Sequence, residues 1–188
     1  MKVAIAGIRG FIGSRLAARL VADGHETVTF ERDWQLPWFT PANAFVWAAG
    51  PSRYVERLTP EAAGNALNEW PRVLGACKAA GVGHVILLSS HAVYGKPTGA
   101  PFTEGSPLRP ASLYGALQAS REHTGMAFHH SKGLPFTSLR LATVYGPGMR
   151  EDALVRVFLD AALTGGEIRL EGGGAQIRPF VHIDNAVD

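Results

Sequence analysis

The stretch KVAIAGIRGFIGS, Lys2–Ser14, decides the fold class of this 188-residue chain. It begins with a short apolar run that is typical of a buried strand. Gly7, Gly10 and Gly13 follow, and the apolar residues after them recur at helical spacing. A strand, a glycine turn and a helix in this order predict the phosphate-binding end of a dinucleotide-binding βαβ unit.

The chemistry of a dinucleotide explains these residue types. Glycine tolerates positive φ and lets the backbone approach a pyrophosphate, and the helix N-terminus offers free N–H groups and a positive dipole end. Glu31 ends the next expected strand, where its carboxylate suits the ribose hydroxyls of NAD, while the adjacent Arg32 leaves NADP open. The cofactor-binding residues expected in this unit are Gly7, Arg9, Gly10, Phe11, Ile12, Gly13, Glu31 and Arg32.

Strands and helices alternate along the rest of the chain. The strands are continuous apolar runs, which indicates a parallel sheet covered on both faces. We therefore expect an α/β, Rossmann-type doubly wound parallel sheet. Pro71 is a candidate break in the second of the expected helices. Strands are expected over 2–6, 26–31, 44–49, 84–89 and 135–142, and helices over 11–23, 60–80, 113–130 and 151–163.

Two parts of the chain are short for this fold, one connection and the C-terminal region. Only residues 32–43 separate the second and third expected strands, so one strand of the usual unit is expected to be lost or reduced. The chain stops at Asp188, just after the strand-like FVHI, and we expect a truncated C-terminal region. The predicted domains are a dinucleotide-binding domain over 1–147 and a small, partial substrate-binding region over 148–188.

Composition excludes several classes of protein. A net charge of +2 without a basic stripe argues against nucleic acid as a partner. No apolar stretch reaches the length of a membrane span, so we expect a cytoplasmic protein. The single cysteine, Cys77, allows no internal disulfide and no thiolate metal cluster, and is interpreted as a small buried side chain. His123, His129 and His130 are interpreted as surface residues, and no metal site is expected.

Several further segments point to one family. They are WAAG (47–50), LLSSHAVYG (87–95), SLYGALQASRE (112–122), LRLATVYGPG (139–148) and IRPFVHIDN (177–185). With the Gly-x-x-Gly-x-x-Gly turn, they resemble the extended short-chain dehydrogenase/reductases, in particular the NAD-dependent sugar epimerase/dehydratase group. The resemblance covers nearly all of the chain.

The resemblance implies a role for each matching residue. Tyr114 would be the acid/base, Ser90 would hydrogen-bond the reacting oxygen, and Gln118 stands where the family has its catalytic lysine. His91, Thr143 and Arg178, together with Ser90, would contact the substrate, Arg178 through a diphosphate. Further cofactor contacts would come from Ala48, Ala49, Gly50, Ser89, Tyr114, Gln118, Leu141 and Val144.

Gln118 departs from the family pattern in a way that matters for catalysis. A lysine one helical turn after the tyrosine lowers the pKa of the phenol by its positive charge. Glutamine can still hydrogen-bond a ribose hydroxyl but carries no charge. The departure predicts weakened activity, a relocated base, or a protein without hydride chemistry.

The leading hypothesis is an NAD-dependent epimerase/dehydratase-type oxidoreductase or isomerase that acts on a nucleotide-sugar by reversible hydride transfer. His91 and Ala92 replace the carboxylate pair of dehydratases, so water elimination is disfavoured. The alternatives are a non-catalytic dinucleotide-binding sensor or scaffold and a reductase of a non-sugar ketone. The expected partner is a small-molecule substrate, and a homodimer is left open.

Overall fold

The computed structural model describes residues 1–30, 41–50, 58–96, 99, 101–168, 170, 174 and 177–188. The chain packs into two compact units, Met1–Leu141 (unit 1) and Ala142–Asp188 (unit 2). Each unit is described by itself. The sequence analysis set its domain boundary slightly later, after residue 147, and its assignment of cofactor binding and substrate binding to the two parts stays a prediction.

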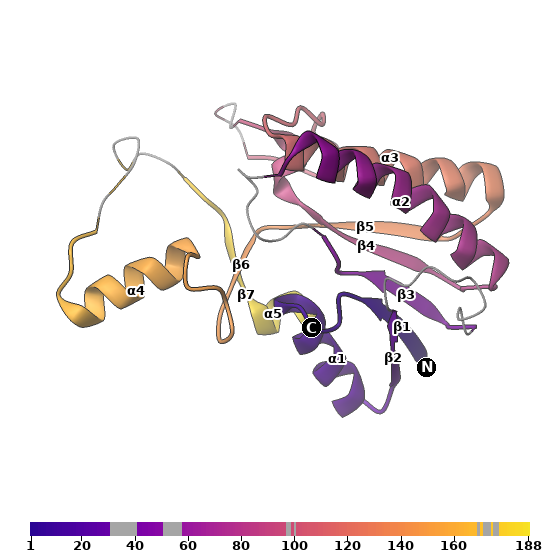
Figure 1. Cartoon of the computed structure of the whole chain (residues 1–188), viewed down its shortest axis with the longest axis horizontal. Coiled ribbons are helices and arrows are strands. Elements are labelled where there is room, and N and C mark those ends of the chain that lie inside the picture. The colour runs from indigo at the N-terminus through magenta and orange to yellow at the C-terminus, as the bar shows by residue number, and fades with distance from the viewer. Residues whose placement is uncertain are drawn as a thin grey trace. The chain divides into compact units, whose positions relative to one another are not determined.

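Unit 1 is built on a parallel sheet of five strands in the order β2-β1-β3-β4-β5 (Figure 1). Each neighbouring pair is parallel. This confirms the predicted fold class. Within the described part of the chain, β2 is an edge strand, and the connection in which a strand was expected to be lost lies mostly outside the described residues. The strands are β1 (Lys2–Ala6), β2 (Glu26–Phe30), β3 (Ala44–Trp47), β4 (Val85–Ser90) and β5 (Phe136–Leu141).

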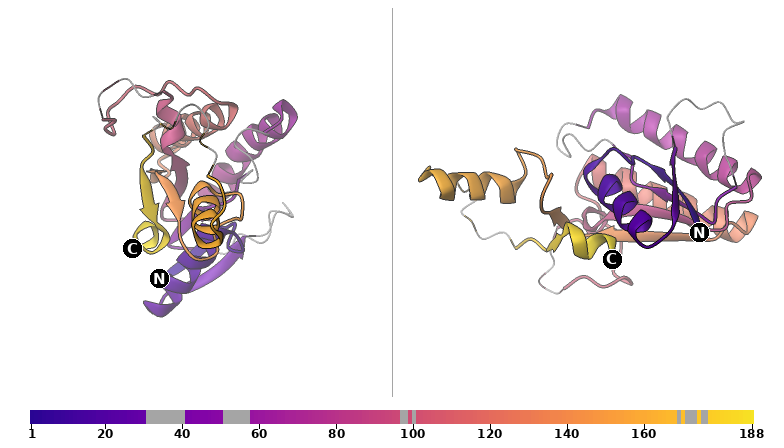
Figure 2. Two further views of the ribbon diagram at one scale, coloured as in Figure 1. Left: turned by 90° about the vertical axis from the view of Figure 1, so that its left-hand side faces the viewer. Right: turned by 90° about the horizontal axis from the view of Figure 1, so that it is seen from below.

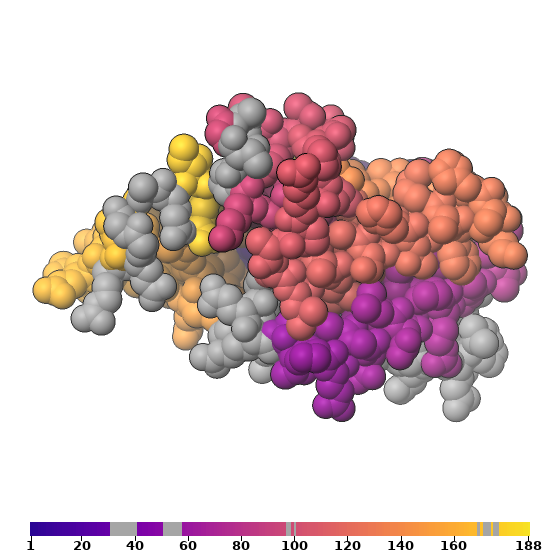
Figure 3. Space-filling view, turned by 90° about the horizontal axis from the view of Figure 1, so that it is seen from above, coloured from indigo at the N-terminus to yellow at the C-terminus, as the bar shows by residue number. Residues whose placement is uncertain are grey.

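Helices cover both faces of this sheet. Helix α1 (Phe11–Ala22) lies on one face, and α2 (Pro60–Ala79) and α3 (Leu113–Lys132) lie on the other (Figures 1 and 2). Figure 3 shows α2 and α3 side by side on their face. A short 3₁₀ helix, η3 (His91–Tyr94), directly follows β4.

Side chains alternate between the two faces along each strand, as a strand requires. Ala4 and Ala6 of β1 join the core under α2, while Val3 and Ile5 join the core under α1. The core under α2 holds a chain of aromatic rings from Trp47 through Trp70 to Phe136, with ring centroids 5.4 and 6.4 Å apart. These contacts explain why the strands are apolar on both faces.

Cys77 lies in the core under α2 and is 0% exposed. Burial raises the pKa of its thiol to about 12, because the apolar surroundings disfavour the thiolate. The interpretation of Cys77 as a buried structural side chain is therefore confirmed.

Pro71 does not break α2, which runs without interruption from Pro60 to Ala79. The expectation of a break was wrong. Pro71 and Leu67, the residue whose carbonyl loses its helical hydrogen bond, both lie on the exposed side of the helix. Water can therefore satisfy that carbonyl, and packing of the opposite side holds the helix together.

Unit 2 contains a second, two-stranded parallel sheet of β6 (Thr143–Tyr145) and β7 (Phe180–His182). Helix α4 (Leu154–Thr164) begins three residues later than expected, since Ala153 is extended and serves as the N-cap. The strand expected in FVHI ends at His182, whose side chain caps α5 (Ile183–Val187). The sequence analysis did not predict β6 or α5.

Among the described residues, no helix is both long enough and apolar enough to cross a membrane.

Candidate active site

The parallel strands bring the predicted site residues of unit 1 to one edge of the sheet. Ala6 at the end of β1 pairs with Trp47 at the end of β3, and Ser90 at the end of β4 pairs with Leu141 at the end of β5. Gly7 and Ala48 directly follow the first two of these strand ends. The carboxyl edge of a parallel sheet, where the strand order changes direction between β1 and β3, is where such folds bind ligands.

The glycine turn joins β1 to α1 as predicted. Gly7 has φ +83°, and a Cβ on it would lie 2.8 Å from the carbonyl carbon and oxygen of Ala48. A Cβ on Gly13 would lie 2.1 Å from the carbonyl oxygen of Gly7. The N–H of Gly10 donates to that same oxygen at 2.9 Å. A side chain at Gly13 is therefore excluded by the backbone of Gly7 across the turn, and one at Gly7 by the backbone that follows β3.

The N-terminus of α1 differs from those of α2 and α3. Thr59 and Ser112 cap the two later helices through their side-chain oxygens. Helix α1 begins after Gly10, which has no side chain to cap it, and its first turn carries no acidic residue. This end of α1 keeps its positive character, which suits a pyrophosphate. Arg9 next to it is exposed, and Phe11 and Ile12 are half-buried.

The predicted ribose-binding residues, Glu31 and Arg32, lie outside the described residues. Ala48, Ala49 and Gly50 follow β3 and are half-buried. Their predicted contacts with a cofactor stay predictions.

Tyr114, Ser90 and Gln118 come together although they lie on different elements. The side chains of Ser90, at the end of β4, and Gln118, one turn further along α3, lie near the Tyr114 phenol, and both act to lower its pKa. Ser90 Oγ also accepts a local hydrogen bond from the N–H of Ala92 at 3.2 Å. The structure thus assembles the three residues predicted to be catalytic.

Gly115 allows this assembly. A Cβ at this position would lie 2.5 Å from the carbonyl oxygen of Ala92 in η3. The first turn of α3 therefore packs directly on the backbone of η3, which follows Ser90. This close approach holds Tyr114 against Ser90.

The Tyr114 phenol is half-buried, and its pKa is raised above its usual value of 10.0. Burial is the largest cause, since it disfavours the phenolate. The hydrogen bond from Ser90, the charge of Arg121 and the hydrogen bond from Gln118 act in the opposite direction. An acid/base of this kind needs such groups, because a phenol that ionises only far above neutral pH is a poor base.

Gln118 is held firmly in the position of the family's lysine. It is 3% exposed, and its Nε2 donates to the carbonyl oxygen of Leu88 in β4 at 3.1 Å. Its Oε1 accepts from Nη1 of Arg121 at 3.1 Å. The position is thus filled by a neutral amide with a buried guanidinium beside it.

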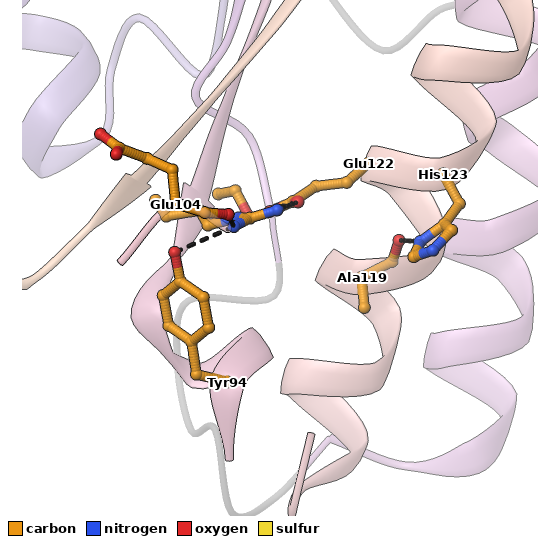
Figure 4. Close-up of polar contacts among 7 residues, drawn as sticks. Tyr94, Glu104, Ala119, Glu122 and His123 are labelled. Atoms are coloured by element: carbon orange, nitrogen blue, oxygen red, sulfur yellow. Dashed lines mark hydrogen bonds and ion pairs between the residues drawn. The ribbon is translucent and has the colours of Figure 1, made fainter. Parts of the chain in front are cut away.

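A second polar cluster adjoins these residues, and we refer to Ser89, Tyr94, Glu122 and Arg140 as the Glu122 cluster. The Glu122 carboxylate accepts from Ser89 Oγ at 2.5 Å and from Arg140 Nη2 at 2.8 Å. Arg140 on β5 also donates to the Tyr94 hydroxyl and to the carbonyl oxygen of Glu104, each at 2.9 Å (Figure 4). The cluster ties α3 to β4, η3 and β5. Ser89 is engaged inside it, and its predicted cofactor contact stays a prediction.

The sequence analysis did not single out Arg121, Glu122 or Arg140. The sequence does contain a pattern that could have identified Arg121 and Glu122. They lie in SREH (120–123), seven and eight positions after Tyr114, on the same helical face. Two charged residues on a face that must be buried indicate a polar network. His123, the next residue, is exposed with Nδ1 2.8 Å from the Ala119 carbonyl oxygen (Figure 4).

The surface interpretation of His123, His129 and His130 is confirmed, because all three are exposed. No cluster of three or more His, Cys, Asp or Glu side chains suited to a metal ion occurs in the described ranges.

The remaining predicted residues are Thr143, Val144 and Arg178 in unit 2 and His91 in unit 1. Thr143 begins β6 and its N–H donates to the carbonyl oxygen of Pro179 at 3.1 Å, while Val144 pairs with Val181 of β7. Arg178 is exposed just before β7. In unit 1, His91 begins η3 and is half-buried. The roles predicted for these residues toward a substrate or cofactor stay predictions.

Comparison with known sequences matches the chain to one enzyme family. Residues 48–188 match the model of the NAD dependent epimerase/dehydratase family. The whole chain is 31% identical to a probable UDP-glucuronate 4-epimerase of Rhizobium meliloti (strain 1021), of which it covers 66%. It is 30% identical to a UDP-glucose 4-epimerase of Mycolicibacterium smegmatis, of which it covers 71%. The chain thus spans about two thirds of the length of these curated relatives.

Solved structures show the same similarity. DesIV, a dTDP-glucose 4,6-dehydratase from Streptomyces venezuelae with NAD and TYD bound, matches the whole chain with a TM-score of 0.88 and 25% identity over 70% of its own length. MoeE5, in complex with UDP-glucose and NAD, matches the whole chain with a TM-score of 0.86 and 28% identity over 69% of its own length. The chain therefore belongs to the NAD dependent epimerase/dehydratase family.

Proposed function

We propose that this protein binds NAD and catalyses reversible hydride transfer at a hydroxyl-bearing carbon of a nucleotide-sugar. The observation that carries the proposal is the meeting of Tyr114, Ser90 and Gln118 at the carboxyl edge of the sheet. This edge also carries the glycine turn that opens α1. The family membership and the relatives that are named as NAD-bound sugar-nucleotide enzymes support it.

The residues of the glycine turn fit NAD. The backbone leaves no room for a side chain at Gly7 or Gly13, and the uncapped start of α1 offers its N–H groups to a pyrophosphate. Arg9, Phe11 and Ile12 flank this end of the helix, and Ala48–Gly50 follow the neighbouring strand. When bound, the nicotinamide would supply the acceptor for a hydride from the sugar carbon.

The side chains of unit 1 provide the proton chemistry. Tyr114 accepts the proton of the substrate hydroxyl as the hydride leaves the same carbon, so that a carbonyl is formed. Ser90 stabilises the reacting oxygen with a hydrogen bond. Gln118, fixed by Leu88 and Arg121 one turn along α3, acts to lower the pKa of the phenol. Return of the hydride to the other face of the carbonyl, with Tyr114 giving its proton back, completes an epimerisation.

The proposed substrate class rests on the names of the relatives and not on contacts seen within unit 1 or unit 2. The named relatives act on UDP-glucuronate and UDP-glucose, or are solved with UDP-glucose. In this proposal the exposed Arg178 pairs with the substrate diphosphate and Thr143 and His91 contact the substrate. Because His91 and Ala92 provide no carboxylate pair, epimerisation or oxidation is favoured over loss of water.

The test is turnover of a panel of UDP-, GDP- and dTDP-sugars by the whole chain with NAD, followed by NADH absorbance and by NMR of the sugar. Tyr114→Phe should lower turnover by about 10²- to 10⁴-fold, because the proton acceptor is lost. Its affinity for NAD, measured by calorimetry, should fall far less than turnover, because the glycine turn still holds the pyrophosphate. Failure to bind NAD would contradict the whole proposal.

Gln118 favours a second candidate, a dinucleotide-binding protein without catalysis. Binding of NAD with no turnover of any sugar-nucleotide would support it. Gln118→Lys separates the two candidates further. A large gain in turnover indicates an enzyme that was weakened at this position, and no gain with intact NAD binding indicates a binding protein.

A further inference from the structure

Arg121 is enclosed in unit 1 next to the residues of the proposed site. It is 2% exposed, and its guanidinium carbon lies 5.5 Å from the centroid of the Trp47 ring. A Cβ on Gly50, just after β3, would lie 3.8 Å from its Nη1. A cation over an indole ring is stabilised by the electrons of the ring. The buried charge therefore has a defined place beside the carboxyl end of β3.

Helix geometry connects Arg121 with Tyr114. Positions 114, 118 and 121 lie on one face of α3, and long side chains on a helix point back toward its N-terminus. Arg121 thus reaches back over Gln118, to which it donates a hydrogen bond at 3.1 Å. Gln118 follows Tyr114 by one helical turn on this face and acts to lower the pKa of the phenol. The amide therefore stands between the guanidinium and the phenol along the helix, as a bridge.

The hydrogen bond from Arg121 polarises the Gln118 amide. The guanidinium contacts the oxygen of the Gln118 amide, which draws electron density toward that oxygen and makes the amide N–H groups stronger donors. A stronger donor favours the phenolate form of Tyr114 over the neutral form. The charge thus acts on Tyr114 both directly through space and through the amide.

We propose that Arg121 supplies, from one turn further along α3 and through Gln118, the positive charge that the family's lysine provides at position 118. Arg121 is then a positioning residue that promotes ionisation of Tyr114. This inference deepens the proposed function, on which its consequence for turnover rests.

The electrostatic balance at Tyr114 agrees with this role. Burial raises the pKa of the phenol, and Arg121 is one of the three groups that lower it, after Ser90 and before Gln118. Arg121 is the one charged group that acts on this phenol among the described residues. The other buried charges of this region, Glu122 on α3 and Arg140 on β5, form an ion pair with each other.

The test reads the ionisation of Tyr114 itself. A ring-fluorinated tyrosine is incorporated at position 114 of the full chain, and its ¹⁹F NMR signal is followed from neutral to alkaline pH. Ring fluorines lower the pKa of a phenol, so the titration ends before the protein denatures. The signal belongs to one residue and needs neither cofactor nor substrate.

Three variants at the bridge and one control are compared in this titration. Arg121→Met removes the charge and should raise the pKa of the labelled phenol by about one unit. Arg121→Lys keeps the charge and should restore most of that shift. Arg19→Met, at an exposed arginine of α1 on the other face of the sheet of unit 1, should leave the pKa unchanged.

The double variant Gln118→Lys/Arg121→Met moves the charge to the family's position. If Arg121 already provides the charge, the phenol pKa of this variant equals that of the parent to within a few tenths of a unit. If Arg121 contributes nothing, the new lysine lowers it by about one unit or more. The second result overturns the proposal, as does an unchanged pKa in Arg121→Met. Should Arg121→Met lose its thermal transition, the double variant decides.

Failure of this inference is distinct from failure of the proposed function. A phenol that ignores Arg121 in a protein that turns over a sugar-nucleotide overturns the role of Arg121 alone. A phenol that responds to Arg121 in a protein that binds NAD without turnover upholds that role and overturns the catalytic proposal.

Discussion

The glycine turn after β1 and the polar residues on α3 belong to the same proposed site but are built in different ways. The turn consists of backbone from one short segment, and its geometry depends on the lack of side chains at Gly7 and Gly13. The α3 site consists of side chains from β4, η3, α3 and β5. The first therefore depends on local sequence except where Gly7 packs on Ala48, and the second depends on the packing of distant segments.

Glu122→Gln should have the largest effect on stability, because it disrupts the side-chain network of the α3 site. The Glu122 carboxyl side chain is 4% exposed and pairs with Arg140, so its loss leaves a guanidinium without its counter-charge. We expect a decrease of about 4 kcal/mol in the free energy of unfolding, measured by urea denaturation. Asp160→Asn is the control, because it removes an exposed carboxylate from the Arg156 pair and should cost about 0.5 kcal/mol or less. Equal losses in the two variants would contradict the structural role of the Glu122 cluster.

Gly13→Ala breaks the backbone half. The added Cβ meets the carbonyl of Gly7 at 2.1 Å, and neither segment of backbone can move without displacing β1 or α1. We expect a loss of about 3 kcal/mol in stability and a large loss of NAD affinity, measured by calorimetry.

The matched control for Gly13→Ala is Gly75→Ala in α2, where nothing lies within 4 Å of the new Cβ. It should stabilise the protein by about 1 kcal/mol, because alanine favours the helix. NAD affinity that survives in Gly13→Ala would show that the turn does not hold the cofactor.

Gly115→Ala tests a position that combines both features. Close backbone packing at this glycine positions side chains that are proposed to be catalytic. The Cβ would meet the carbonyl oxygen of Ala92 at 2.5 Å and push the start of α3 away from η3. We expect a loss of about 2 kcal/mol in stability. Turnover should fall further than NAD affinity, because Tyr114 moves away from Ser90. Gly64→Ala in α2, with open space around it, is the control.

The smallest expected effect on stability comes from Cys77. Its thiol is a titratable group in the apolar core, unlike the titratable groups of α3, which have polar neighbours. The thiol pKa is 9.0 in the unfolded chain and about 12 in the folded protein. Between these values the folded state holds the proton more tightly, so stability is complete below pH 9 and falls as the pH rises. Each pH unit in this window should cost about 1.4 kcal/mol.

Cys77→Ala should remove that part of the alkaline loss of stability, measured by urea denaturation at pH 8, 9 and 10. The same steepness in the variant and the parent would contradict the burial of the thiol.

The sequence alone determined the βαβ start, the parallel α/β class and the bounds of most elements to within a few residues. These features depend on local rules, since apolar runs form buried strands and glycines form turns with positive φ. It also named Tyr114, Ser90 and Gln118, through a motif whose four-residue spacing places two of them on one helical face.

The tertiary structure decided how those residues work. Arg121 and Glu122 are neighbours on α3, yet one acts on Tyr114 through Gln118 and the other pairs with Arg140, 18 positions further along the chain. Which partner each side chain meets depends on how α3 packs against β4 and β5. Pro71 shows the same limit, because its tolerance depends on which side of α2 faces solvent. Local spacing determines helical faces, and only the packing of distant segments determines what those faces meet.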